Sequence, residues 1–425
     1  MQMRVAFVFP PIWTPYSDGS LQIWNHEVST RLAKACDVTV YAGPFQPAEV
    51  QNLGNVHYRY FSTVWDDRML RAYRCLRDLR RQRGPMFSSD VWYPTFAWNV
   101  ARDIQRVKYD VVHVYYYPQF ALLIKRLNPE ARVVVHTMGE WLTQVPFTNL
   151  EERLAQLDGV ISCGDFVTRR FRAAFPHLAG LCRTVPMGVS PEAFLPSAGS
   201  HRSERSGGWR LLYVGRLSPE KGVHVLLDAF VLLSQIFPDI SLTVVGPEWV
   251  APQEDITDLC LEQAVINDLM PFYRSGYLDQ LRRRVTVSLK DRVTFAGLVP
   301  HGEIAPYYAD ADLYINPSLY ESFGVSIIEA MAAAVPVVAT DAGAVRDVVV
   351  DGFTGVLVRS ASPSALVDGA TRLLCDSGLR TSVVATAREA VLRQFSWETV
   401  CGRLLDVYET LLRGIHSGGV SVSAD

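Results

Sequence analysis

The chain lacks several features that would mark whole classes of protein. No uninterrupted apolar stretch approaches the roughly 18 residues of a membrane-spanning helix, so no transmembrane segment is predicted. The seven cysteines show neither C-x-x-C nor His-Cys spacing, which argues against a disulfide framework or a structural zinc site. Neither G-x-G-x-x-G nor G-x4-G-K-[ST] occurs, so oxidoreductases with a dinucleotide fingerprint and P-loop enzymes lack support. A formal net charge of −3 gives no general attraction to nucleic acid.

Length and composition predict the organisation of the chain. A chain of 425 residues is too long for one hydrophobic core, so two domains are predicted. The opening residues, MQMRVAFVFPP, hold one Arg and a five-residue apolar run, which is too short for the core of a signal peptide. Together with cysteines that fit reduced thiols, this predicts a cytoplasmic protein. Residues 196–208 are mostly small and polar and predict a linker between the domains.

The stretch Pro317–Thr340 carries the densest chemistry. Glu321 lies in a polar loop, and Gly324 stands where the backbone must bend sharply or approach a ligand, directly before a helix expected from Val325. The unpaired N–H groups of a helix N-terminus can hold a diphosphate. Glu321 and Glu329, on either side, are suited to accept sugar hydroxyls, so a nucleotide-sugar would use all three features. The alternative is a surface loop and an exposed helix that each carry an ordinary carboxylate.

This stretch resembles the E-x7-E signature of the retaining glycosyltransferases of family GT4, which have the GT-B fold. Typical members read E-x-F-G-x4-E-A-M-A-x-G-x-P-V-V-A, and Ala334 stands here where Gly is usual. The resemblance implies that Glu321 contacts hydroxyls of the donor sugar and Glu329 those of the ribose. The residues of this stretch expected to bind the nucleotide-sugar are Glu321, Ser322, Phe323, Gly324, Val325 and Glu329.

A second motif supplies cations. The segment G-R-L-x-x-x-K-G follows a predicted strand, Leu211–Val214, and places Arg216 and Lys221 on either side of a strand-to-helix turn. Both side chains can therefore converge on an anion above the sheet edge. Two exposed cations in a turn are otherwise simply solvated. The motif resembles the GT4 pattern in which both residues neutralise the donor diphosphate.

Other positions acquire roles from the resemblance alone. Gly19 and Ser20 stand where the family usually has Gly-Gly in a loop close to the donor diphosphate. His136, at the end of a buried strand, matches a histidine close to the donor sugar, whereas His113 matches a less specific feature and is taken as structural. Val299 lies in a loop expected to contact the nucleotide base through backbone atoms.

The sequence Asp310-Ala311-Asp312 is a weak metal-binding signal. D-x-D marks metal sites in the other large glycosyltransferase fold, but here it merely precedes a buried strand. We therefore interpret these carboxylates as structural and expect neither a metal nor a cofactor.

The most basic segment is residues 65–83, with Arg at positions 68, 71, 74, 77, 80, 81 and 83. Its apolar residues recur near helical spacing, which is typical of an amphipathic helix that lies on an anionic membrane surface. The favoured alternative is a solvated helix face, because Asp66, Asp67 and Asp78 dilute the charge and bulky aromatic anchors are sparse. A peripheral contact with the inner face of a membrane stays open.

The resemblance covers about residues 4–412 and implies a GT-B architecture, an α/β fold with two doubly wound Rossmann-like domains facing a cleft. Residues 1–200 form the expected acceptor domain and 209–395 the nucleotide-sugar domain, with 248–289 as an insertion packed on the latter. A helix over 396–412 is expected to cross back to the first domain, followed by a disordered tail, 413–425.

The predicted function is that of a retaining glycosyltransferase of the hexosyltransferase type. UDP-sugar is the favoured donor and GDP-sugar the next, and the acceptor is a glycan, a lipid or a small metabolite. The expected catalytic residues are Glu321, Arg216, Lys221 and His136. A sugar-nucleotide epimerase, a phosphorylase-like enzyme on the same fold and an inactive nucleotide-sugar-binding module remain alternatives.

Overall fold

The computed structural model describes residues 2–12, 19–44, 52–79, 85–145, 147–194, 208–250, 263–274 and 276–414. These form two compact units. Unit 1 combines Met1–Pro186 with Trp397–Asp425, and unit 2 is Met187–Ser396. The predicted linker at 196–208 and the predicted disordered tail lie almost wholly outside the described residues.

The boundary between the units differs from the predicted one, because residues 187–194 group with unit 2 rather than with the first domain. The ring of Phe194 packs edge-on against that of Tyr308, with centroids 5.5 Å apart. The N–H of Val189 donates to the carbonyl of Phe395 at 2.8 Å. Both partners belong to unit 2, so the segment is tied there by packing that composition does not reveal.

Unit 1 is built on an eight-stranded sheet among its described residues, parallel except for the short β3. In spatial order the strands are β3 (Asn52–Leu53), β4 (Val56–Tyr60), β2 (Asp37–Ala42), β1 (Arg4–Val8), β5 (Val111–Tyr115), β6 (Arg132–Thr137), β7 (Gly159–Ser162) and β8 (Cys182–Thr184). Its helices are α1 (Ser20–Leu32), α2 (Val64–Leu79), α3 (Pro94–Val107), α4 (Pro118–Leu127), α5 (Trp141–Gln144), α6 (Leu150–Leu154), α7 (Asp165–Ala174) and α16 (Trp397–Arg413).

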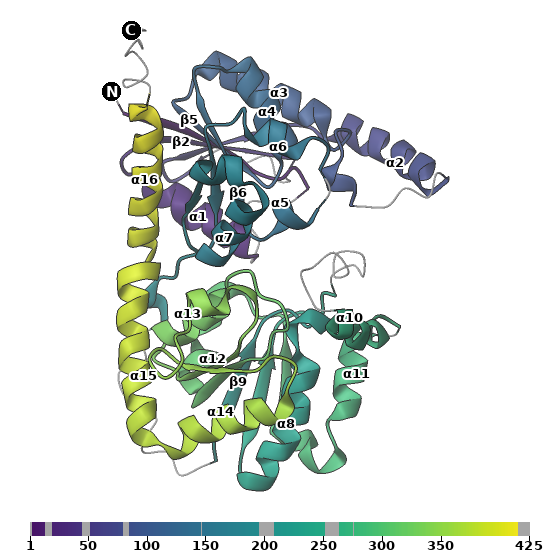
Figure 1. Ribbon diagram of the computed structural model, residues 1–425, viewed down its shortest axis with the longest axis vertical. Coiled ribbons are helices and arrows are strands. Elements are labelled where there is room, and N and C mark those ends of the chain that lie inside the picture. The colour runs from purple at the N-terminus through teal and green to yellow at the C-terminus, as the bar shows by residue number, and fades with distance from the viewer. Residues whose placement is uncertain are drawn as a thin grey trace. The chain divides into compact units, whose positions relative to one another are not determined.

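The two faces of this sheet receive alternate residues of each strand, because side chains point to opposite faces with a period of two. Val112 and Val114 of β5 pack in the core that includes α3 and α4. His113, between them, lies against Trp24 of α1 and Tyr408 of α16 on the other face. Figure 1 shows α16, in yellow, running beside α1.

Helix α2 is fastened to α3 by two carboxylates. Asp66 is fully buried and accepts the N–H groups of Thr95 and Phe96 in the first turn of α3, at 2.9 and 3.0 Å. Asp67 accepts the hydroxyl of Tyr93 at 2.7 Å. Asp66 and Asp67, which were expected to dilute the positive charge of residues 65–83, thus have their carboxylates in contact with residues at the start of α3.

Unit 2 contains a six-stranded parallel sheet within the described part of the chain. The spatial order is β11 (Val293–Gly297), β10 (Ser241–Val245), β9 (Arg210–Val214), β12 (Leu313–Asn316), β13 (Val337–Thr340) and β14 (Val356–Val358). Its helices are α8 (Val223–Ile236), α10 (Gln263–Leu269), α11 (Tyr277–Arg284), α12 (Ala305–Asp310), α13 (Val325–Ala332), α14 (Pro363–Cys375) and α15 (Ser377–Ala390).

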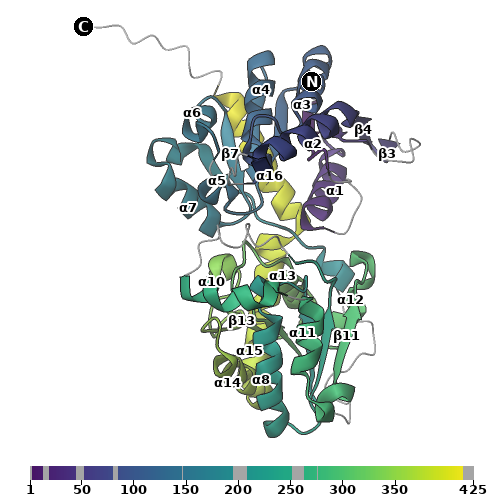
Figure 2. The same ribbon diagram turned by 90° about the vertical axis from the view of Figure 1, so that its right-hand side faces the viewer.

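The region expected as an insertion packs on unit 2 where it is described. Phe272, Tyr277, Leu281 and Leu289 are buried in the same core as β9, β10 and α8. Helix α11 lies along α8, as Figure 2 shows. Residues 251–262 of the region lie outside the described residues.

Both sheets reverse their strand order once, as the predicted doubly wound architecture requires. In unit 2 the chain winds outward from β9 through β10 to β11, then returns to place β12 on the other side of β9. Loops that leave neighbouring strands in opposite directions open a crevice at the carboxyl ends of the strands, where such sheets bind ligands. In unit 2 that switch point lies between the loops after β9 and β12.

Candidate active site

The loop after β9 positions Arg216 with two partners. The Arg216 guanidinium donates from Nη2 to Oε1 of Glu220 at 3.2 Å, and the hydroxyl of Ser218 donates to the other oxygen of that carboxylate. The indole ring of Trp249 lies 4.5 Å from Cζ of Arg216, in cation–π contact. Glu220 is 3% exposed and Trp249 is 53% exposed, so the cation joins a buried anion and a surface ring. Among the described residues, Nη1 of Arg216 has no hydrogen-bond partner.

Lys221 and Glu321 form a largely buried ion pair. Nζ of Lys221 lies 2.9 Å from Oε2 of Glu321, and the two side chains are 17% and 13% exposed. The hydroxyl of Ser318 donates to the same oxygen at 3.3 Å. Burial acts to raise the pKa of Glu321, but the charge and hydrogen bond of Lys221, with Arg216 and Ser318, outweigh it and hold that pKa below its ordinary value. Glu321 is therefore an anion at neutral pH.

Backbone contacts hold the two loops together. Gly222 follows the 3-10 turn Pro219–Lys221 with φ +67°, and a Cβ there would lie 2.0 Å from the carbonyl oxygen of Pro317. The N–H of Leu319 donates to the carbonyl of Glu220 at 2.8 Å. A glycine is needed at position 222 because both the conformation and the space exclude a side chain.

Gly324 sets the start of α13. It has φ +97° and ψ +58°, and no side chain caps the helix that begins at Val325. The first N–H groups of α13 have no partner inside the helix, so they remain donors for an anion. The neighbouring Phe323 is 4% exposed, and its ring packs on Phe395 with centroids 5.7 Å apart. Only the backbone of Phe323 is thus placed to meet a ligand, whereas Ser322 is half-buried.

The far end of α13 explains what is unusual about Ala334. The N–H of Val335 donates to the carbonyl of Ala330 at 2.9 Å, and the N–H of Ala334 donates to that of Met331 at 3.1 Å. This is a Schellman cap, in which the residue after the helix adopts the left-handed conformation. Ala334 has φ +55°, where glycine would be unstrained. The departure from the family pattern therefore falls at a strained position.

Glu329 lies inside α13 and is held at both oxygens. Nε2 of His301 lies 2.8 Å from Oε1, and the hydroxyl of Tyr308 donates to Oε2 at 2.7 Å. Glu329 is 4% exposed. Each carboxylate oxygen has two lone pairs, so one further acceptor position remains at each oxygen. Val299 lies two residues before His301, so the loop after β11 reaches the same side of unit 2 as Glu329.

The acidic pair before β12 is joined to a single cation. Asp312 accepts the backbone N–H of Arg210 at 2.9 Å, and its side chain also contacts the Arg210 guanidinium at 3.4 Å. Asp310 pairs with Nη1 of the same residue. Arg210 is the first residue of β9, so both carboxylates lie at the amino end of the sheet, opposite the edge that carries Arg216 and Lys221.

The remaining predicted residues belong to unit 1. Gly19 immediately precedes α1 and Ser20 begins it, both exposed, and Gly19 is in the extended conformation, with φ −79°. The ring of His136 does not reach the surface, because it is fully buried between Trp24, Tyr115 and His113. Its role toward a donor sugar stays a prediction.

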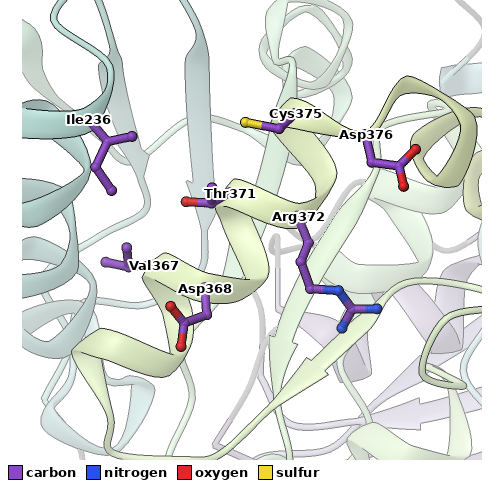
Figure 3. A pocket seen from close by; sticks show the side chains of 7 residues that line it. All are labelled: Ile236, Val367, Asp368, Thr371, Arg372, Cys375 and Asp376. Atoms are coloured by element: carbon purple, nitrogen blue, oxygen red, sulfur yellow. The ribbon is translucent and has the colours of Figure 1, made fainter.

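A surface pocket of about 510 Å³ lies elsewhere on unit 2, between α8 and α14 (Figure 3). Its lining residues are Ile236, Val367, Asp368, Thr371, Arg372, Cys375 and Asp376. It contains none of the residues that the sequence identified, so it is separate from the candidate site.

Three residues of this site were missed by the sequence analysis. Trp249 follows β10, next to β9, and the rule that ligands gather at the carboxyl ends of neighbouring strands would have identified it. His301 and Tyr308 carry no local signal, because their contact with Glu329 arises only when α12 and α13 pack together.

Two doubly wound sheets, one of which brings paired cations, a carboxylate and a helix N-terminus to its switch point, are typical of the GT-B class of glycosyltransferases. Residues 22–193 match the family described as "Glycosyltransferase Family 4", and residues 201–390 match "Glycosyl transferases group 1". The chain belongs to the GT4 family of GT-B glycosyltransferases and is an enzyme of the hexosyltransferase type, as the resemblance predicted.

Two related glycosyltransferases are similar to this chain over different lengths. A phosphatidyl-myo-inositol mannosyltransferase of Mycobacterium leprae is 34% identical over 53% of this chain and 53% of its own length. The lipopolysaccharide 1,2-N-acetylglucosaminetransferase of Salmonella typhimurium is 24% identical over 95% of this chain and 97% of its own. The higher identity is thus confined to about half of each chain.

Solved structures agree on the fold. The sucrose-phosphate synthase of Thermosynechococcus elongatus is 22% identical with a TM-score of 0.70, covering 97% of this chain and all of that chain. The HepE protein of Anabaena, solved with UDP and glucose, is 19% identical with a TM-score of 0.68, covering 96% of this chain and all of that chain. The described part of this chain contains no helix long and apolar enough to cross a membrane.

Proposed function

We propose that the protein transfers a sugar from a nucleotide-diphosphate sugar to an acceptor with retention of the anomeric configuration. The observation that carries the proposal is the convergence of Arg216, Lys221 and Glu321 at the carboxyl ends of β9 and β12, beside the open N-terminus of α13. Two cations and several N–H donors suit a diphosphate, and an ionised carboxylate suits sugar hydroxyls.

Each residue has a distinct role in this proposal. The diphosphate is bound by Nη1 of Arg216, by Lys221 and by the N–H groups of Gly324 and Val325. Glu321 accepts hydroxyls of the donor sugar and keeps Lys221 in position. Glu329, fixed in α13, accepts the ribose hydroxyls.

The reaction needs charge stabilisation more than a nucleophile. The bond between the anomeric carbon and the diphosphate oxygen breaks while the acceptor oxygen bonds to the same face of the sugar. The acceptor proton passes to the leaving phosphate oxygen. Negative charge grows on the diphosphate as the bond breaks, so the cations and helix amides stabilise the transition state more than the ground state. The proposal assigns no step to a metal.

UDP-sugar remains the first donor to test and GDP-sugar the second. The HepE structure contains UDP and glucose, and at 19% identity it supports the shared fold alone, so the order of donors stays the one that the sequence favoured. For the acceptor, the named relatives act on a phosphatidylinositol lipid and on a lipopolysaccharide. We therefore include lipid and glycan acceptors beside small metabolites.

A peripheral membrane contact through α2 fits a lipid acceptor. The outer face of α2 exposes Trp65 at 67%, Val64 at 51% and Met69 at 41%. Arg68 lies over the Trp65 ring at 5.2 Å. Because Asp66 and Asp67 contact α3 and its flanking residue Tyr93, arginines and apolar side chains dominate this face, a combination that suits anionic headgroups. Binding to phosphatidylglycerol vesicles that is lost in Trp65→Ser would support the contact, and equal binding by both proteins would exclude it.

Calorimetry with UDP and GDP, followed by incubation with a panel of nucleotide-sugars, tests the main proposal. Slow release of free sugar with one donor supports a transferase. Conversion of the donor to an isomeric nucleotide-sugar supports the epimerase alternative, and phosphate-dependent release of sugar 1-phosphate from a glycan supports the phosphorylase. Binding of nucleotide-sugars without any turnover supports an inactive module.

The two carboxylates should separate in the same assays. Glu329→Gln removes a charged acceptor and is expected to weaken UDP binding by about tenfold, the size of one charge-assisted hydrogen bond. Glu321→Gln should leave UDP binding within about threefold and act mainly on turnover of the intact donor, because its contact is to the sugar. Glu303→Gln, an exposed glutamate before α12, is the control. Equal losses of UDP affinity in both variants would mean that the sugar is held elsewhere.

A further inference from the structure

A chain of hydrogen bonds in unit 1 links the terminal helix to His136. The hydroxyl of Tyr408 on α16 lies 2.7 Å from Nδ1 of His113 on β5. Nε2 of His113 lies 3.0 Å from Nδ1 of His136 on the neighbouring strand β6. All three side chains are fully buried.

Aromatic rings surround His113 and His136. The Trp24 ring lies 4.8 Å from that of His136 and 5.6 Å from that of His113, and the Tyr115 ring lies 5.9 and 5.0 Å from them. Burial lowers the pKa of His136 to about 3, and burial together with His136 lowers that of His113 well below its usual value. Both rings are therefore neutral, with one proton each.

The positions of these protons follow from hydrogen-bond accounting. Burial also holds the pKa of Tyr408 well above its usual value, so its O–H keeps its proton. Among the described residues, the one partner of this hydroxyl is Nδ1 of His113. If Nδ1 carried the proton, the buried O–H of Tyr408 would have no acceptor, which is the costly case. Tyr408 therefore donates, and His113 carries its proton on Nε2.

The same accounting fixes the second ring. Since Nε2 of His113 donates to Nδ1 of His136, the single proton of His136 lies on its own Nε2. This Nε2 is buried, and no described residue is its partner. The reverse arrangement would leave two polar atoms unpaired, the hydroxyl of Tyr408 and the lone pair of His136, in place of one.

We propose that Tyr408, acting through His113, fixes His136 as the Nε2–H tautomer, so that His136 presents a hydrogen-bond donor and not a general base. Tyr408 and His113 are then positioning residues. The donor role toward a substrate oxygen rests on the proposed function, whereas the tautomer itself does not.

Two more buried donor atoms belong to residues in contact with this aromatic cluster. Nε1 of Trp24 and Nδ2 of Asn25 are also buried and have no hydrogen-bond partner in the described residues. Both are donors, like Nε2–H of His136. Asn25 already accepts the Tyr115 hydroxyl through its oxygen, at 3.2 Å. This part of unit 1 thus offers donors in excess and suits an oxygen with free lone pairs, such as a sugar hydroxyl or a water.

The tautomers can be measured on the nucleotide-free full chain labelled with 15N-histidine. Long-range 1H–15N correlation spectra distinguish a protonated ring nitrogen from a bare one, and His113→Gln and His136→Gln spectra assign the two rings. We expect Nε2 protonated and Nδ1 bare in both rings, with the reverse form below about a fifth, because one extra unpaired buried polar atom costs at least about fivefold in population. A proton on Nδ1 of His136 would overturn the proposal.

Tyr408→Phe tests the origin of this preference. Without the hydroxyl, the two arrangements leave equal numbers of unpaired atoms, so a measurable fraction of the reverse tautomer should appear in both rings. Tyr115→Phe is the matched control. It removes a buried hydroxyl from the same aromatic cluster, and that hydroxyl bonds to Asn25 and to neither histidine. An unchanged spectrum in Tyr408→Phe, or an equal change in the control, would refute control by Tyr408. The wild-type spectrum decides the tautomer even if a variant fails to fold.

Turnover with a donor gives a second readout. Gln places an amide N–H close to the position of Nε2 but cannot act as a base, so His136→Gln should keep turnover within about tenfold of wild type while His136→Ala loses more. Equal losses in both variants would contradict the donor role. If neither variant affects turnover, His136 lies outside the site, and the tautomer result stands without it.

Discussion

Breaking the largely buried ion pair between Lys221 and Glu321 should cost more stability than breaking an ion pair on the protein surface. In Lys221→Met the carboxylate of Glu321, 13% exposed, loses its nearest cation. Removing one partner of a buried pair costs about 3–5 kcal/mol, and the residual exposure here places the expected cost near 3 kcal/mol. Glu321→Gln keeps an acceptor for Lys221 and should cost about 1–2 kcal/mol.

The double variant gives the decisive number. Lys221→Met with Glu321→Gln leaves neither charge unpaired, so its cost should fall about 2 kcal/mol short of the sum of the single costs. Amide hydrogen exchange of peptides containing β9 and β12 reads the stability of unit 2 separately from unit 1. If Lys221→Met costs about 3 kcal/mol of stability, amide hydrogen exchange in this variant should be roughly a hundredfold faster. Arg346→Met, which breaks the exposed pair with Asp341, is the control and should change exchange little.

The pH dependence of the stability that Glu321 contributes should reverse its sign in Lys221→Met. In the wild type the pKa of Glu321 is lowered, so the folded state binds fewer protons, and the stabilisation is complete above the ordinary pKa of a glutamate and is lost as pH falls through the folded value. In Lys221→Met burial prevails and raises that pKa, so the carboxyl is less costly when protonated. The cost of Lys221→Met should therefore shrink on acidification from pH 7 to pH 5. Additive single costs within about 0.5 kcal/mol, or a cost that grows in acid, would refute the reasoning.

Three further predictions concern other parts of unit 2. Ala334→Gly relieves a left-handed alanine, worth about 1–2 kcal/mol, against about 0.5–1 kcal/mol for the greater freedom of unfolded glycine. The midpoint of thermal unfolding should therefore rise by about 1–3 °C, and a fall would mean that the alanine at position 334 is not strained. Trp249→Ala removes the ring over Arg216 and should weaken UDP binding by about twofold to fivefold in calorimetry, with Trp249→Phe intermediate; unchanged affinity would make the contact incidental. Turnover should survive EDTA, whereas a loss restored by Mn²⁺ would return Asp310 and Asp312 to consideration as ligands.

The backbone framework of the site could be predicted from the sequence because its determinants are local. Short apolar runs define β9 and β12, and Gly222 and Gly324 mark the sharp turns that follow them. Parallel strands end at the same edge of a sheet, which explains why Arg216 and Glu321 follow β9 and β12 at that edge. The family pattern then supplied their roles.

The partners of these side chains could not be predicted in the same way. Lys221 and Glu321 are 100 positions apart, and a pattern that names both as ligands does not say that they pair with each other. His301 meets Glu329 only through the packing of α12 on α13. Asp66 was taken as a surface charge, because nothing local shows that it caps α3.

Ala334 and His113 illustrate two different limits. The left-handed conformation of Ala334 was hidden because sequence alone does not give φ for a non-glycine residue. His113 was taken as structural, which is true of its burial but misses its link to Tyr408, 295 positions away. Such contacts are decided by tertiary packing, where local patterns carry no information.

The division of unit 1 between the two ends of the chain has a consequence for biosynthesis. A ribosome completes residues 1–186, then makes the whole of unit 2, and only then produces α16. At about 5–20 residues per second, the first part of unit 1 waits roughly 10–40 s for its last helix. During that interval the surface that later receives Trp397, Leu404 and Tyr408 is uncovered, so nascent chains should depend on chaperones at this stage. A chain that ended after Ser396 would lack α16, so Nδ1 of His113 would lose its contact with the hydroxyl of Tyr408.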